Sequence, residues 1–126
     1  MAIIDPGLSA RVELVVADAD TAEAMRSGTV PVLATPRVVA LCEEATCLAL
    51  ADAIEPGATT VGTQVQLKHV APVAVGSTVA AEATLERVEG RRLTFSVSVT
   101  DAAGLVAAGK VQRVVVDRAD FAAKAR

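Results

Sequence analysis

Apolar and polar residues alternate along much of this chain, and one long stretch has the spacing of a helix instead. The first alternating stretch has apolar residues at Ala10, Val12, Leu14 and Val16. In the clearest one, the apolar residues Leu93, Phe95, Val97 and Val99 alternate with Ser and Thr residues. Further strand-like stretches cover about residues 59–70, 78–88 and 104–117, with turn residues between them. Because side chains of a strand alternate between two faces, the pattern predicts five strands that each bury one face.

Residues 35–54 have the helical spacing. Thr35 and Pro36 predict the start of the helix, because a Thr hydroxyl can cap free backbone N–H groups and Pro suits the first turn. The sequence Glu-Pro-Gly at 55–57 predicts its end. Apolar residues cover most of its circumference, which predicts a helix wrapped by other elements. One apolar stripe consists of Val38, Leu41, Cys42, Ala45, Leu48 and Ala49.

These elements follow the order strand, helix and four strands, and we assign residues 1–126 to one domain of the α+β class. Since the last strands follow one another through hairpin-type turns, we expect a five-stranded antiparallel sheet that curls around the helix, which is the hotdog fold. Edge strands this rich in Val invite pairing with another copy, so we predict a homodimer. Residues 18–26 are expected to form a short helix at most, and the polar tail 118–126 is expected to fray.

Two ionisable residues interrupt the apolar faces. His69, the only histidine, falls on the strand face formed by Val61, Thr63, Val65 and Leu67. Glu43 falls on the helical stripe of Val39, Thr46 and Leu50, where a carboxylate requires a partner or a wet pocket. An imidazole titrates near neutral pH, so the two groups together suggest a catalytic cleft.

Composition argues against several kinds of partner. The net charge is -3, and Phe95 and Phe121 are the only aromatic residues, so we expect no nucleic acid partner. No apolar stretch approaches the roughly 20 residues that span a bilayer, so we expect no membrane partner. Residues 1–13 lack the features of a secretory signal, which predicts a cytoplasmic location. Cys42 and Cys47 fall on different faces of the helix and no zinc spacing is present, so we expect neither a disulfide nor a metal.

Four segments resemble, in order and spacing, the fluoroacetyl-CoA thioesterase family of hotdog proteins, and these are ATPRVVALCEEA, TVGTQVQLKHVAPVAVGS, VEGRRLTFSVSVTDAAG and GKVQRVVVD. The resemblance implies an acyl-CoA thioesterase that needs no cofactor beyond the CoA of its substrate. It also implies functional roles for a Thr ahead of the central helix, a Glu within the helix and a His late in the next strand. These positions match Thr35, Glu43 and His69. Gly62 matches a Gly near the thioester carbonyl, and Arg113 matches an Arg of the last strand.

The residue types suit thioester hydrolysis, although each has a structural alternative. Glu43 is expected to activate water or to attack the carbonyl itself, and His69 to orient water, shuttle a proton or donate to the substrate oxygen. Thr35 could bond Glu43 or the acyl group, and Gly62 lets its backbone N–H approach the carbonyl. The alternatives are capping by Thr35, a solvated Glu43, a hydrogen-bonded core His69, a bulge at Gly62 and a structural ion pair of Arg113.

The stretch before Thr35 departs from the family. The fluoroacetate-specific member is understood to cover its acyl group with aromatic side chains there, whereas this chain has SGTVPVL. We therefore expect an acyl pocket lined by Val30, Val32 and Leu33, without selectivity for fluorinated substrates. The substrate could be carried by CoA or by a carrier protein. Two rival functions stay open at this point, a non-catalytic acyl-CoA-binding protein and a hotdog hydratase or dehydratase.

Overall fold

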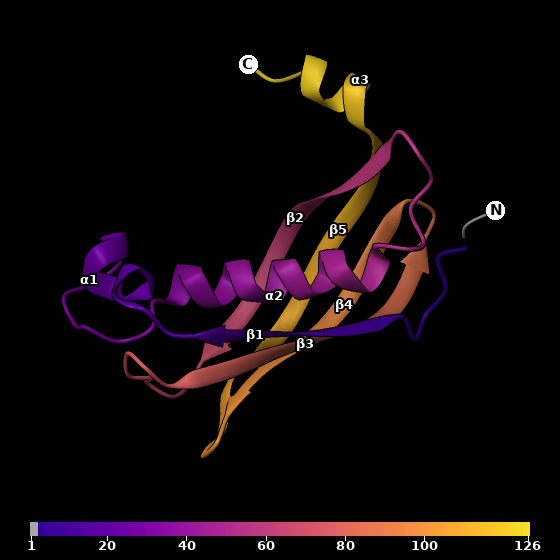
Figure 1. Cartoon of the computed structure of the whole chain (residues 1–126). Coiled ribbons are helices and arrows are strands. Elements are labelled where there is room, and N and C mark those ends of the chain that lie inside the picture. The colour runs from indigo at the N-terminus through magenta and orange to yellow at the C-terminus, as the bar shows by residue number, and fades with distance from the viewer. Residues whose placement is uncertain (1–2) are drawn as a thin grey trace.

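One antiparallel sheet and one long helix make up most of the molecule. The computed structural model describes residues 3–126, so the first two residues of the segment considered for a secretory signal lie outside it. Neighbouring strands all run antiparallel, in the order β1-β3-β4-β5-β2. The strands are β1 (Ser9–Val15), β2 (Ala58–His69), β3 (Thr78–Glu89), β4 (Arg92–Asp101) and β5 (Gly104–Asp117). The predicted α+β hotdog fold is confirmed, and Figure 1 shows the sheet curving behind the helix.

The long helix α2 (Thr35–Leu50) lies across one face of the sheet and packs chiefly against β1 and β3 (Figure 1). Its inward side chains join those of β3 and β4 in one core, which includes Val38, Leu41, Cys42, Ala45, Phe95 and Val97. Burial of this apolar surface is the main force that holds the helix on the sheet. The prediction of a wrapped helix was wrong for one face, because Ala40, Cys47, Leu48 and Ala51 are exposed there.

The ends of α2 differ from the prediction in two ways. The helix stops at Leu50, four residues earlier than expected, and residues 51–54 form turns. The N-cap is Ala34, which has no side chain that could accept a hydrogen bond, so capping by Thr35 was wrong. Thr35 is already inside the first turn, and its hydroxyl is free for another partner. Within residues 3–126, no helix combines the length and the hydrophobicity needed to cross a lipid bilayer.

A bulge in β2 changes which residues face the helix. The pairing with β5 shifts between Gly62, opposite Arg113, and Gln64, opposite Gln112. Since directly opposite residues point to the same face and Arg113 is buried, Gly62 faces α2 while Thr63 is exposed. The prediction that Val61 and Thr63 share the face of His69 was therefore wrong. The bulge at Gly62, which sequence left as an alternative, is present.

Short helices occur near both ends of the chain. Residues 18–26 contain a 3-10 turn (Asp18–Asp20) and the helix α1 (Ala22–Met25), so the expected short helix exists in two pieces. The tail forms the helix α3 (Arg118–Ala123), contrary to the expectation that it frays. The Asp117 carboxylate caps α3 by accepting a hydrogen bond of 2.9 Å from the backbone N–H of Asp120. Figure 1 shows α3 standing beyond the end of the sheet.

Candidate active site

Thr35 and His69 form the first of two polar groups. Thr35 begins α2 and His69 ends β2, and the Thr35 hydroxyl oxygen lies 2.9 Å from Nδ1 of His69. Nε2 of His69 is buried and has no hydrogen-bond partner among the described residues. An unpaired buried polar atom is costly, so Nε2 of His69 requires a partner that the described residues of this chain do not supply. Nε2 is a donor if the Thr35 hydroxyl donates to Nδ1, and it is a basic lone pair if Nδ1–H donates to Thr35.

A hollow of about 340 Å³ adjoins this pair. Its wall comes from the segment that follows α1 and from the residues that follow β2. Val30, Val32 and Leu33, which sequence placed in an acyl pocket, line this hollow together with Thr35 and His69. Small-ligand pockets typically measure about 300–1,000 Å³. The hollow is thus large enough for a short acyl chain, with the polar Thr–His pair available at its wall.

Glu43 belongs to the second polar group, with Arg113, Thr60 and Gly62. Arg113 donates from Nη1 to Oε2 of Glu43 at 3.2 Å, and from Nε and Nη2 to the hydroxyl and carbonyl oxygens of Thr60 at 2.9 and 3.0 Å. The Arg113 side chain is 8% exposed and that of Glu43 is 35% exposed. A buried guanidinium that donates to three oxygens holds the carboxylate in one position. The ion pair of Arg113, one of the alternatives considered above, is therefore present, and Glu43 is paired rather than simply solvated.

Gly62 makes room for the Glu43 carboxylate. A Cβ at position 62 would collide with Oε2 of Glu43 and would lie 3.4 Å from Nη1 of Arg113. Only glycine allows the strand backbone to come this close to the carboxylate. The glycine thus has a steric role that the sequence did not reveal, beside the predicted approach of its N–H to a carbonyl.

The two groups lie apart within one chain. Thr35 and Glu43 are eight residues apart on α2, which corresponds to about 12 Å along the helix axis. Gly62 and His69 are seven residues apart on β2, which corresponds to about 23 Å. No hydrogen bond of residues 3–126 joins Glu43 to Thr35 or His69; the Thr35 hydroxyl pairs with His69 instead. Within one chain, the Glu43 carboxylate and the His69 imidazole therefore do not come into contact.

Cys42 lies next to Glu43 in the sequence but faces the core. Burial, and secondarily the charge of Glu43, raise the pKa of the Cys42 thiol to about 11. A thiol with this pKa stays protonated at neutral pH and is a poor nucleophile. No thiolate therefore lies beside Glu43 at neutral pH.

Sequence reasoning missed two residues that position the site. Thr60 holds Arg113, and its inward orientation depends on the bulge, so strict alternation could not identify it. Asp20 pairs with Arg37 at 3.0 Å, which ties the segment before α1 to the first turn of α2. The ion pair joins two segments that flank the hollow, and its partners are too far apart in sequence to be matched by pattern alone.

Comparison with known proteins shows which family shares this fold and much of this sequence. The family described as fluoroacetyl-CoA-specific thioesterase, FlK, matches residues 16–119. The chain belongs to this family. It is a thioester hydrolase with the hotdog fold, as the resemblance implied. The fluoroacetyl-CoA thioesterase of Streptantibioticus cattleyicolor is 39% identical over 95 residues, which cover 75% of this chain and 68% of that protein.

Solved structures of the FlK family and of other thioesterases have the same architecture. A mutant of the fluoroacetyl-CoA-specific thioesterase FlK matches with a TM-score of 0.91 and 31% identity, over 98% of this chain and 96% of that chain. An FlK mutant in complex with fluoroacetate and CoA matches with a TM-score of 0.88 and 31% identity, over 94% and 99% of the two chains. A thioesterase superfamily member from Thermus thermophilus matches with a TM-score of 0.89 and 30% identity, over 98% and 91%.

Proposed function

We propose that this FlK family member hydrolyses acyl-CoA thioesters with Thr35, Glu43 and His69 as its catalytic residues, in a homodimer. The observation that carries the proposal is the hydrogen-bonded pair of Thr35 and His69 on the wall of a hollow of acyl size, with Nε2 of His69 buried and without a protein partner among the described residues. CoA rather than a carrier protein is supported by the FlK mutant structure that contains CoA. No further cofactor and no metal are expected, and the cytoplasmic location stays a prediction.

The residues divide the chemistry between them. Hydrolysis forms a bond from a water oxygen to the thioester carbon, breaks the C–S bond, removes a proton from water and delivers one to the thiolate. Glu43 takes the proton from water, or attacks first and is released by water, while Arg113 keeps its carboxylate in place. His69 donates from Nε2 to the thioester oxygen or to the leaving sulfur, and Thr35 holds its ring.

A homodimer brings the two polar groups closer together. β2 is an edge strand of the sheet, and its outer backbone groups are open to pairing. If two β2 strands pair antiparallel about a two-fold axis at their centre, Gly62 of the partner subunit lies opposite Val65. Along the strand, that position is about 13 Å from His69, compared with about 23 Å for Gly62 of the same chain. The exposed small and apolar face of α2 would be covered by the same contact.

The test is the Glu43→Gln variant, assayed by release of free thiol from a panel of acyl-CoA thioesters. We expect a loss of kcat of about 100-fold or more, because general acid–base catalysis contributes about 10²–10⁴-fold. Glu13→Gln is the matched control, because Glu13 is exposed on β1 at the sheet edge away from β2, and this variant should keep full activity. Full activity of Glu43→Gln would contradict the catalytic role of Glu43. No turnover by the natural enzyme with any thioester would contradict the proposed function and favour the acyl-CoA-binding alternative.

The dimer is tested separately by sedimentation at micromolar concentration. A single species of twice the chain mass is expected. A monomer that hydrolyses thioesters would disprove the shared arrangement while leaving the catalytic roles of the residues intact.

A further inference from the structure

The helix α3 exposes its largest apolar side chain, that of Phe121. Phe121 is one of two aromatic residues in the chain, and it is 46% exposed, whereas Phe95 is fully buried. Helix α3 has six residues and packs only lightly, against β5. An isolated helix of this length is marginal in water, so a cap and a few contacts at one end are weak support. These observations leave the Phe121 side chain available for contact with a surface outside its own chain.

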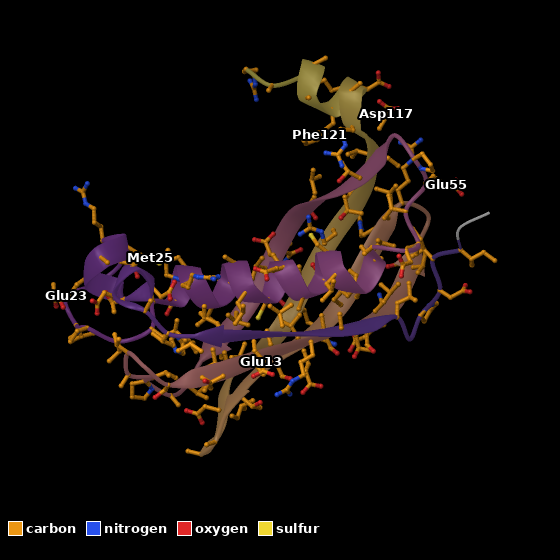
Figure 2. All side chains as sticks on the ribbon, in the orientation of Figure 1. Glu13, Glu23, Met25, Glu55, Asp117 and Phe121 are labelled. Atoms are coloured by element: carbon orange, nitrogen blue, oxygen red, sulfur yellow. The ribbon has the colours of Figure 1, made fainter. Side chains whose placement is uncertain are left out.

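The hollow beside Thr35 and His69 is too far from α3 of the same chain to be its partner. Asp117, which precedes α3, pairs with Ala58 at the first residue of β2, whereas His69 is the last residue of that strand. The length of β2 therefore separates them by about 36 Å. Figure 2 agrees, since Phe121 and Met25, on α1 beside the hollow, lie at well-separated places in the molecule.

The dimer proposed above changes this distance. In antiparallel pairing about a central two-fold axis, Ala58 lies opposite His69 of the partner subunit. Helix α3 then begins about two strand spacings, or about 10 Å, from the end of the partner's β2. The residues that follow His69 include Val70, which is exposed, and Pro72, and both line the hollow. An exposed aromatic ring and an open apolar hollow thus occupy matching ends of the two strands.

We infer that α3 of each protomer covers the hollow of its partner and that Phe121 forms part of the wall around the acyl chain. The inference rests on the proposed dimer and acyl site. It makes each acyl pocket complete only when two copies are assembled, and it assigns Phe121 to the recognition of the substrate's aliphatic part. Each methylene of the acyl chain that the Phe121 ring shields from water should raise the affinity for the substrate about fourfold.

Engineered disulfides test this contact without requiring any activity. In a Cys47→Ser background, the Phe121→Cys/Val70→Cys variant is expected to oxidise to a covalent dimer on a non-reducing gel. A disulfide requires Cα atoms about 4.4–6.8 Å apart, which residues 121 and 70 of one chain cannot reach. Phe121→Cys/Val15→Cys is the matched control, because Val15 is 62% exposed and Val70 is 59% exposed, but Val15 lies on β1 at the opposite edge of the sheet. Equal cross-linking of both variants, or none in a dimeric protein, would overturn the inference.

Kinetics provide the second measurement. Phe121→Ala is expected to lower kcat/KM for hexanoyl-CoA about tenfold and for acetyl-CoA about twofold, because the longer chain reaches more of the ring. Phe121→Leu should recover most of the loss, and both variants should sediment as dimers. The same loss for both substrates, or none, would refute the role of the ring. If the natural enzyme hydrolysed no thioester, the proposed function would fail, and the cross-linking result alone would decide where α3 lies.

Discussion

The contact between Gly62 and Glu43 predicts a specific effect of the Gly62→Ala variant. The added Cβ would collide with Oε2 of Glu43, so the carboxylate must move away from the strand. This movement lengthens the hydrogen bond of 3.2 Å from Arg113 and leaves a guanidinium that is 8% exposed with only Thr60 as a partner. Breaking a fully buried ion pair costs about 3–5 kcal/mol. Because Glu43 is one-third exposed and Arg113 keeps two hydrogen bonds, we expect a destabilisation of about 1–2 kcal/mol.

The effect on catalysis should be larger than the effect on stability. A displacement of about 1 Å at a catalytic group can cost about 100-fold in rate, and we expect a loss of that size in kcat/KM for Gly62→Ala. Stability is measured by urea unfolding and activity by thiol release on the same preparations. Glu43→Ala, with and without Gly62→Ala, is the informative second pair, because without the carboxylate the added Cβ displaces no partner of Arg113 and should cost no further stability. A Gly62→Ala enzyme with unchanged stability and kcat/KM would refute the close approach of strand and carboxylate.

Three further outcomes follow from the same structure. Thr35→Val should lower kcat about tenfold or more, whereas Thr35→Ser should not, because the Thr35 hydroxyl is the group that holds the His69 ring. A thiol-release assay at several pH values distinguishes the two variants. Ellman's reagent should modify the buried Cys42 only after unfolding. Because burial raises the pKa of the Cys42 thiol to about 11, the free energy of unfolding should fall as the pH rises from about 9 to 11, as urea unfolding at several pH values would show. Relative rates with acetyl-CoA and fluoroacetyl-CoA should differ by less than about tenfold, because residues 27–33 contain no aromatic side chain, and a strong fluoroacetyl preference would contradict the prediction.

Local periodicity was sufficient for most of the architecture. The alternation of residues 93–100 and the helical spacing after Thr35 identify elements whose apolar faces must be buried, and the turns between strands imply antiparallel neighbours. The order of elements then leaves few topologies other than the one observed. Periodicity singled out Glu43 and His69, and the family resemblance matched both and added Thr35, but neither gave the distances between these residues within this chain.

The sequence by itself determined the five strands, the long helix, their antiparallel order and the residue types of the site, because side-chain periodicity and turn chemistry act over a few neighbouring positions. Tertiary structure alone decided that β2 bulges near Gly62, that the Thr35 hydroxyl turns to His69 rather than to its own helix, and that Arg113 holds Glu43. It also decided that the tail forms α3, where the pattern predicted fraying. In each case, contacts with residues distant in the sequence are more favourable than the local hydrogen bonds. Which of the two is favoured depends on distances between elements, and a short stretch of sequence does not contain these distances.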